Sequence, residues 1–241
     1  DSVQADAEMI AMTIEALYHA GLSDFQISIG NLEYFKGICA EAGLDEETEL
    51  ELREYISGKN YFGAEELLDA THVHHKVKEQ LLKVSDLFGT AAILNDAKKA
   101  VSNNRSKKAI ERLEKVYQVL CDYGVEKYVS FDLGMLSKYN YYTGIIFKGY
   151  TYGVGDAIVK GGRYDNLLHR FGKQAAAIGF VIVVDDLLAA MNRQGVIVSG
   201  TESYIKIYYT EADFKEKLKE CRQLRASGKN VELLPFQRKS V

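Results

Sequence analysis

The sequence predicts an α+β protein whose core is an antiparallel sheet flanked by helices, with a helical insertion and a small C-terminal α/β segment. Three observations support this fold class. Residues 4–42 alternate between helical and strand periodicity. Residues 45–122 show helical periodicity throughout and are rich in Glu, Lys and Leu. Residues 127–184 are rich in aromatic and β-branched residues punctuated by glycine, a composition typical of strands.

The first elements follow from local patterns. Residues 4–20 predict an amphipathic helix that Asp1 or Ser2 caps and Gly21 ends. Its apolar face at helical spacing comprises Met9, Ile10, Thr13, Ile14, Leu17 and Tyr18. Residues 25–29 alternate apolar and polar side chains, which predicts a half-buried strand. A second helix is predicted over residues 31–42, ended by Gly43.

Residues 45–124 predict an all-helical insertion with loops near Gly58, Gly63 and Gly89. The last helix, over residues 105–123, ends at Gly124. One of its faces is apolar and comprises Ile110, Leu113, Val116, Tyr117 and Leu120. We expect such faces to pack on one another or on a partner, because an amphipathic helix must bury its apolar stripe.

The β-rich region predicts strands over residues 128–133, 142–147, 150–159 and 177–184, then a helix over residues 185–193. Residues 196–198 close this unit. A short tail follows, predicted as a strand (203–209), a helix (211–226) and a strand (230–234). The predicted domains are therefore residues 1–198 and residues 199–241.

The composition is that of an ordinary globular protein, with 241 residues, 47% hydrophobic and 27% charged. The formal net charge of −4 argues against nucleic-acid binding, because phosphate recognition requires clustered Lys and Arg. No apolar run reaches membrane-spanning length, and three widely spaced cysteines form neither a disulfide framework nor a zinc site. We expect a cytoplasmic protein. The absence of an initiator Met leads us to expect further structure before Asp1.

Three motifs in the β-rich region carry candidate chemistry: Tyr-Asn-Tyr-Tyr-Thr-Gly at 139–144, Lys-Gly-Gly-Arg-Tyr-Asp at 160–165, and Ala-Ile-Gly-Phe-Val-Ile at 177–182. Paired tyrosines can sandwich a small ring and hydrogen-bond to it. A Gly-Gly step lets a ligand or another strand approach closely, and Arg163 with Asp165 can order that turn by a charge-assisted pair. Each motif alone also fits an ordinary Tyr-rich sheet. The functional interpretation depends on their joint presence in this order.

Together the motifs resemble those of histidyl-tRNA synthetase and its paralogues, members of the class II aminoacyl-tRNA synthetase fold family. The family's two histidine signatures read roughly Arg-Gly-Leu-Asp-Tyr-Tyr-Thr-Gly and Gly-Gly-Arg-Tyr-Asp. Residues 4–10 also resemble the family's segment after motif 2. The resemblance covers about residues 1–194. It implies a class II synthetase-like core that lacks its N-terminal part, where motifs 1 and 2 would lie.

Three positions depart from the family pattern. Ser137 stands where the family has an Arg, Asn140 replaces an Asp, and Asp186 lies near the expected Arg of motif 3. The resemblance implies that the first Arg stabilises charge on the histidine carboxylate and the α-phosphate, and that the second braces ATP. A serine supplies no positive charge, and an acid repels a triphosphate. We therefore predict that aminoacyl-adenylate chemistry is lost and that the chain has no catalytic residue.

A synthetase-like pocket without its catalytic arginines resembles the regulatory subunits of short-form, hetero-oligomeric ATP phosphoribosyltransferase, the enzyme of the first step of histidine biosynthesis. Residues 131–135 and 147–150 share this resemblance. It implies a non-catalytic subunit that assembles with the catalytic subunit, as a homodimer within a larger hetero-oligomer, supports its activity and helps transmit histidine feedback. No cofactor or metal is implied. Two alternatives stay open: a divergent histidyl-tRNA synthetase catalytic-domain fragment, and a stand-alone amino-acid- or RNA-binding paralogue.

The same resemblance assigns a remnant, histidine-like ligand pocket, because the family's tyrosines line the pocket for the histidine side chain. Its candidate residues are Tyr141, Tyr142, Thr143, Gly144, Gly161, Gly162, Arg163, Tyr164 and Asp165. Whether histidine binds there or at a subunit interface stays open. Asp6 and Glu8 are weaker candidates, interpreted as exposed first-turn acids favoured by the helix dipole.

The remaining candidates have simpler interpretations. His72 and His75 would share one helical face at i, i+3 beside His74, a spacing that can hold a metal. No Glu-x-x-His pattern accompanies them, so we interpret them as a solvated helical face. Two lysine pairs, 98–99 and 107–108, are interpreted as solvated helix ends. The cysteines are interpreted as small buried hydrophobes: Cys39, Cys121 and Cys221.

Overall fold

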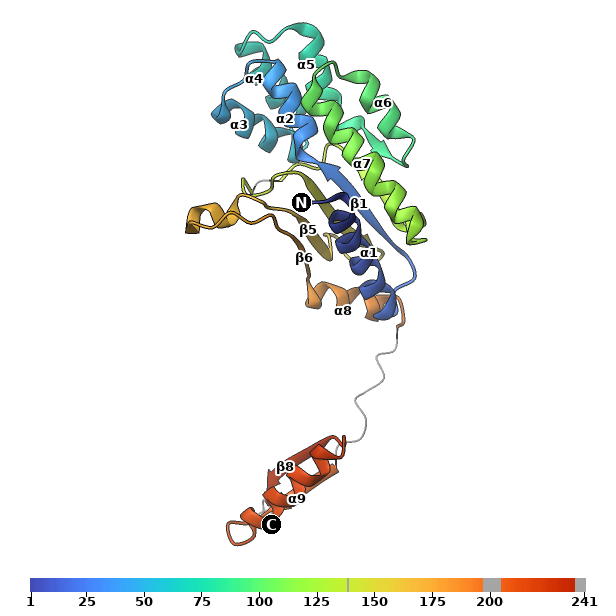
Figure 1. Cartoon of the computed structure of the whole chain (residues 1–241), viewed down its shortest axis with the longest axis vertical. Coiled ribbons are helices and arrows are strands. Elements are labelled where there is room, and N and C mark those ends of the chain that lie inside the picture. The colour runs from blue at the N-terminus through green and yellow to red at the C-terminus, as the bar shows by residue number, and fades with distance from the viewer. Residues whose placement is uncertain (138, 197–204, 237–241) are drawn as a thin grey trace. The chain divides into compact units, whose positions relative to one another are not determined.

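The computed structural model describes residues 1–137, 139–196 and 205–236, and it divides into two compact units, Asp1–Val196 and Ile197–Val241 (Figure 1). Each unit has its own hydrophobic cluster. The second unit consists of β7 (Ile205–Tyr209), α9 (Phe214–Ala226) and β8 (Val231–Pro235), with β7 and β8 paired in parallel. This is the strand–helix–strand tail expected from the sequence.

The first unit is built on a six-stranded sheet in the order β2-β3-β1-β4-β5-β6. All neighbouring strands in it are antiparallel except β1 and β3, which pair in parallel. The strands are β1 (Phe25–Asn31), β2 (Phe88–Gly89), β3 (Val129–Asp132), β4 (Ile145–Thr151), β5 (Val159–Arg163) and β6 (Ile178–Ile182). The two-residue β2 lies inside the segment for which only helices were predicted.

Helices α1 (Val3–His19) and α7 (Asn104–Asp122) pack on each other. Helix α1 also contacts β6, and α7 also contacts β1. Both helices therefore lie on one face of the sheet (Figure 1). Ser2, rather than Asp1, caps α1, because its hydroxyl accepts the Ala5 N–H at 3.1 Å. Helix α2 (Leu32–Glu41) also packs on α7, so the last helix of the predicted insertion covers the sheet itself. That residues 45–124 form an insertion stays a prediction.

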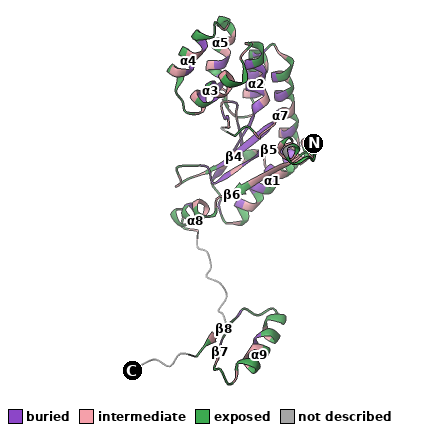
Figure 2. Ribbon diagram, turned by 90° about the vertical axis from the view of Figure 1, so that its left-hand side faces the viewer, coloured by how far each residue is buried: buried purple, intermediate pink, exposed green. Residues whose placement is uncertain are grey.

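The other helices of the segment gather beyond one end of the sheet, as both views show (Figures 1 and 2). They are α3 (Glu46–Ser57), α4 (Tyr61–Ala70), α5 (His75–Leu82) and α6 (Ile93–Ala100), with a 3-10 turn, η1 (Lys83–Asp86), after α5. Polar side chains cap the helix starts: Asp45 for α3, Asn60 for α4 and Asn103 for α7. Helix α8 (Val184–Arg193) follows β6, as predicted within one residue.

Two strand predictions were wrong in detail. The strand predicted at 150–159 does not exist as one element, because β4 ends at Thr151, the chain reverses near Gly153 (φ 92°), and β5 begins at Val159. Strand β1 is buried on both faces except at Gln26, rather than half-buried as predicted. The predicted closing segment 196–198 lies outside the described residues beyond Val196.

The histidine trio does not share a helical face. His72 lies in the turn after α4 with φ 54°, His74 caps α5 and His75 begins that helix. Among the described residues no group of His, Cys, Asp and Glu has the arrangement of a metal site. Cys39 and Cys221 are buried as interpreted, whereas Cys121 is half-buried. None of the described helices has the length and apolar character needed to cross a membrane.

Candidate functional site

Tyrosines from two of the three motifs meet beside strand β6. The ring centroids of Tyr141 and Tyr142 lie 4.4 Å apart, and the ring of Tyr164 stands edge-on to Tyr141 at 6.3 Å. A cavity of about 280 Å³ opens between them and the third motif, lined by Tyr141, Tyr142, Lys160, Tyr164, Leu167, Gly179, Phe180 and Val181. We call it the tyrosine pocket. All three sequence motifs contribute to it.

The glycines of these motifs make room for the protein's own aromatic rings. A Cβ on Gly162 would lie 2.6 Å from Cε1 of Tyr142, and one on Gly179 would lie 2.9 Å from the hydroxyl of Tyr164. A Cβ on Gly161 would lie 2.4 Å from the Phe147 ring on the opposite face of the sheet. The Gly-Gly step therefore admits side chains, and neither glycine lines the tyrosine pocket itself.

The phenol of Tyr142 keeps its proton over the physiological range. Burial raises its pKa, and the neighbouring Tyr141 raises it further. A protonated phenol is both a donor and an acceptor of hydrogen bonds. The pocket thus combines aromatic faces with a neutral hydrogen-bonding group, a combination suited to a small ring that carries polar atoms.

Arg163 ties the second motif to helix α1 through Asp6, and both side chains are buried. The carboxylate of Asp6 accepts hydrogen bonds from Nε and Nη2 of Arg163 at 2.9 and 2.6 Å, and from Nε of Arg112 at 2.7 Å. Burial alone would lower the pKa of Arg163, but its bonds to Asp6 and Asp165 raise it. The interpretation of Asp6 as an exposed acid was wrong, whereas Glu8 is exposed.

Asp165 joins the three motifs to one another. Its Oδ1 accepts from Nη1 of Arg163 and from the N–H of Ala177, both at 2.9 Å. Its own N–H donates to the hydroxyl of Thr143 at 3.1 Å. The predicted Arg163–Asp165 pair is confirmed, and it belongs to a larger network that links residues of all three motifs.

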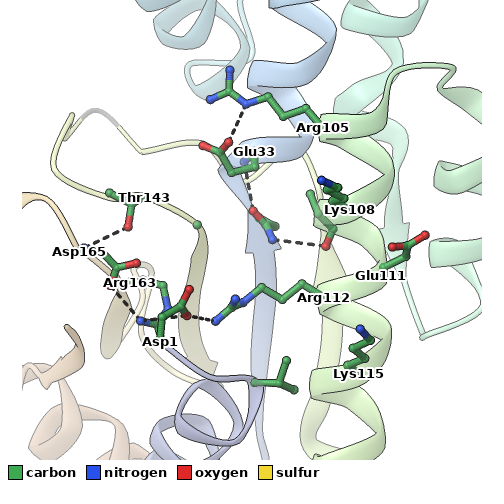
Figure 3. A pocket seen from close by; sticks show the side chains of 14 residues that line it. Asp1, Glu33, Arg105, Lys108, Glu111, Arg112, Lys115, Thr143, Arg163 and Asp165 are labelled. Atoms are coloured by element: carbon green, nitrogen blue, oxygen red, sulfur yellow. Dashed lines mark hydrogen bonds and ion pairs between the residues drawn. The ribbon is translucent and has the colours of Figure 1, made fainter. Parts of the chain in front are cut away.

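The candidate residues therefore divide between two cavities. Thr143, Gly144, Arg163 and Asp165 line a second cavity of about 400 Å³, opposite cationic side chains of α7 (Figure 3). Arg105 and Arg112 in that wall are already paired, Arg105 with Glu33 and Arg112 with Asp6 and Asp1. Only the tyrosines of the predicted set line the tyrosine pocket.

Sequence reasoning missed Arg53, a buried side chain of α3 that reaches the segment before the tyrosines. Its Nη1 lies 3.3 Å from Oδ1 of Asn140 and 3.5 Å from the carbonyl oxygen of Ser137, and its Nη2 pairs with Glu49. Two of the three departures from the family pattern therefore contact one guanidinium group. A Glu and an Arg four residues apart on a helix give no sequence signal beyond an ordinary surface pair.

Replacing Arg53 by methionine is expected to loosen the segment that leads into the tyrosine pocket. The change removes the donors to Asn140 and Ser137 and leaves Glu49 without its partner. Hydrogen–deuterium exchange should become at least severalfold faster at the amides of residues 139–142. Glu54→Gln, an exposed change on the same helix, serves as the control. Unchanged exchange in the methionine variant would show that Arg53 does not hold this segment.

Asp186 lies in the first turn of α8 and lines neither of these two cavities. Acidic residues favour a helix N-terminus because of the helix dipole, so its position has a local structural reason.

The sheet with helices on one face is the class II aminoacyl-tRNA synthetase fold. A solved structure of histidyl-tRNA synthetase from Nostoc sp. has this fold and superposes with a TM-score of 0.73 at 21% sequence identity. The match covers 100% of this chain and 59% of that one. The sequence profile of histidyl-tRNA synthetase matches residues 1–187. The chain belongs to the histidyl-tRNA synthetase family.

Several individual proteins of known name are similar to almost the whole chain. The chain is 41% identical over 230 residues to the ATP phosphoribosyltransferase regulatory subunit of Acetivibrio thermocellus, covering 95% of this chain and 55% of that protein. It is 39% identical to the regulatory subunit of Clostridium kluyveri, over 97% of this chain and 60% of that protein. A structure from Bacillus halodurans C, described as regulatory subunit/histidyl-tRNA synthetase, gives a TM-score of 0.75 at 31% identity over 100% of this chain and 62% of that one. The chain thus spans little more than half the length of these relatives.

Proposed function

We propose that the protein is the non-catalytic regulatory subunit of a hetero-oligomeric ATP phosphoribosyltransferase, acting in the first step of histidine biosynthesis. In this role it supports the activity of the catalytic subunit and takes part in feedback inhibition by histidine. The observation that carries the proposal is a tyrosine pocket lined by all three motifs in a chain that has Ser137 and Asn140 at two positions where the family has charged residues. Relatives named as regulatory subunits, near 40% identity over almost the whole chain, support the same conclusion.

The proposal assigns histidine to the tyrosine pocket. Tyr141 and Tyr142 pack against each other with centroids 4.4 Å apart, so an imidazole ring would lie against their outer surfaces in the pocket, and the Tyr142 hydroxyl can bond to a ring nitrogen. Ser137 lacks the positive charge of the family's Arg, and Asn140 lacks the carboxylate of the family's Asp, so the charges that adenylate formation would require are missing at both positions. The pocket then senses histidine and does not activate it. The proposed assembly is a homodimer within a larger complex with the catalytic subunit, in the cytoplasm.

Co-purification tests the assembly. The protein should bind the catalytic subunit at micromolar concentration and raise its rate of phosphoribosyl transfer, and histidine should suppress that rate. Failure to bind at this concentration would favour a stand-alone amino-acid-binding paralogue. Histidine-dependent exchange of pyrophosphate into ATP by the protein alone would instead establish a divergent histidyl-tRNA synthetase.

Replacing Tyr142 by phenylalanine is expected to weaken inhibition of the assembled enzyme by histidine roughly tenfold, because a hydrogen bond to the ligand contributes about 1–1.5 kcal/mol. The change removes only the hydroxyl, so the ring packing and the uninhibited rate should stay the same. Tyr152→Phe, at a side chain that is 72% exposed and outside the pocket, is the matched control. Equal inhibition of both variants would place the histidine site elsewhere.

A further inference from the structure

A third cavity, of about 480 Å³, lies where α3 and α4 meet the end of the sheet and shares no residue with the tyrosine pocket. Its walls come from α3, the start of α4, the 85–88 segment, the 132–136 segment and strand β4. We call it the helix–sheet cavity. Its volume is in the range of pockets that hold small organic ligands.

Backbone contacts fix the walls of the helix–sheet cavity. The N–H of Leu133 donates to the carbonyl of Leu87 at 3.0 Å, and a Cβ on Gly134 would lie 2.7 Å from Cα of Ser85. The hydroxyl of Ser57 donates to the carbonyl of Leu136 at 3.4 Å, which joins α3 to the same wall. The cavity is therefore formed before any ligand arrives, and a ligand would bind without first ordering its walls.

Three charged groups line this cavity without pairing to one another. Asp132 accepts a hydrogen bond from the N–H of Gly134 at 2.9 Å. Burial raises the pKa of the Asp132 carboxyl, although that hydrogen bond and the charges of Lys148 and Lys59 lower it in part. Across the described ranges of the chain, neither lysine has an ion pair or a hydrogen bond from its ammonium group, although both line the cavity. Two free cations against one carboxylate favour a ligand of net negative charge.

Three aromatic side chains also line the cavity. Phe88, Tyr61 and Tyr150 are 60%, 45% and 41% exposed, far more than is usual for rings of this size. Exposed rings beside unpaired lysines can stack on a planar base while the lysines hold an anionic group. A free amino acid would leave much of the volume empty and would present no net charge to the excess cation.

We propose that the helix–sheet cavity binds a nucleoside monophosphate. The phosphate lies toward Lys59 and Lys148, the base lies against the aromatic side chains, and the ribose hydroxyls donate to Asp132. This assignment does not rest on the proposed function, because the tyrosine pocket and the helix–sheet cavity are lined by different residues.

Isothermal titration of the 241-residue chain with AMP, adenosine and inorganic phosphate tests the proposal. AMP should bind with one saturable site, at least tenfold more tightly than either adenosine or phosphate. If adenosine binds as tightly as AMP, the lysines do not contribute to binding and the proposed phosphate site is wrong. If inorganic phosphate binds as tightly as AMP, the aromatic side chains do not contribute and the proposed base site is wrong. An absence of AMP binding up to millimolar concentration would overturn the proposal.

Lys148→Met and Lys59→Met should each weaken AMP binding roughly tenfold, because each removes one charge-assisted contact while keeping the aliphatic stem. Lys219→Met, at an exposed lysine of α9 in the second unit, is the matched control and should bind AMP as the unaltered chain does. Phe88→Ala, at an exposed ring that the fold does not need, should also weaken AMP binding severalfold. Unchanged affinity in both lysine variants would place the AMP site elsewhere and overturn the assignment.

Discussion

Replacing Asp6 by alanine is expected to lower the free energy of unfolding by about 3–5 kcal/mol, because the buried Nε and Nη2 of Arg163 lose their acceptor while only Nη1 keeps its carboxylate partners, Asp165 and Asp1. Asp6 is fully buried, and the Arg163 side chain is only 4% exposed. Arg112 loses one of its partners as well. The same change removes the link between α1 and the second motif, so the tyrosine pocket should lose order together with the fold.

Urea unfolding followed by far-ultraviolet circular dichroism measures this effect. Glu8→Gln is the matched control, since Glu8 lies on the same helix and is exposed, and it should change stability by less than about 0.5 kcal/mol. A loss below about 1 kcal/mol for Asp6→Ala would mean that solvent reaches Arg163 readily, contrary to the buried geometry.

Replacing Gly162 by alanine is expected to lower the free energy of unfolding by about 1–3 kcal/mol, because the added methyl group has no space. Its Cβ would lie 2.6 Å from the Tyr142 ring and 2.9 Å from the carbonyl oxygen of Ile145. The ring can rotate away, but the carbonyl belongs to the neighbouring strand. A displaced Tyr142 would also alter the tyrosine pocket, so the near-ultraviolet signal of the tyrosines should change.

Gly155→Ala provides a control of the same chemical size. A Cβ at Gly155 would meet nothing within 4 Å, and its φ lies outside the left-handed region. Alanine there should leave stability unchanged or raise it slightly, since it reduces the freedom of the unfolded chain. If both alanine variants unfold at the same urea concentration, crowding around Gly162 is not a constraint on the fold.

Periodicity and capping residues were enough to predict most of the fold. The first helix, Ser2 as one of its two candidate caps, most of the helical segment apart from β2, and the C-terminal strand–helix–strand unit are confirmed, because each depends on patterns within a few residues. The reversal between β4 and β5 was missed because residues 150–159 are rich in aromatic and apolar residues on both sides of the turn. Such a run is compatible with one long strand unless the turn glycine is recognised.

The site was harder to predict, because its polar contacts join distant parts of the chain. The motifs identified the tyrosines, but nothing near Asp6 in the sequence indicates that it pairs with a residue 157 positions away. Arg53 reaches Asn140 from 87 positions away for the same reason. The division of the predicted residues between two cavities depends on alternation along β5, which places Arg163 and Gly162 on opposite faces of the sheet.

The pairing of Asp6 with Arg163 also constrains the order of events during synthesis. Helix α1 leaves the ribosome well before β5, so the buried carboxylate of Asp6 lacks Arg163 until 157 further residues have been translated. At elongation rates of about 5–20 residues per second this interval is roughly 10–30 seconds. During it Asp6 can pair only with Arg112, and α1 cannot yet make its contacts with β6. The first unit therefore completes its folding late, when Arg163 emerges, and nascent chains shorter than that should remain open to proteases.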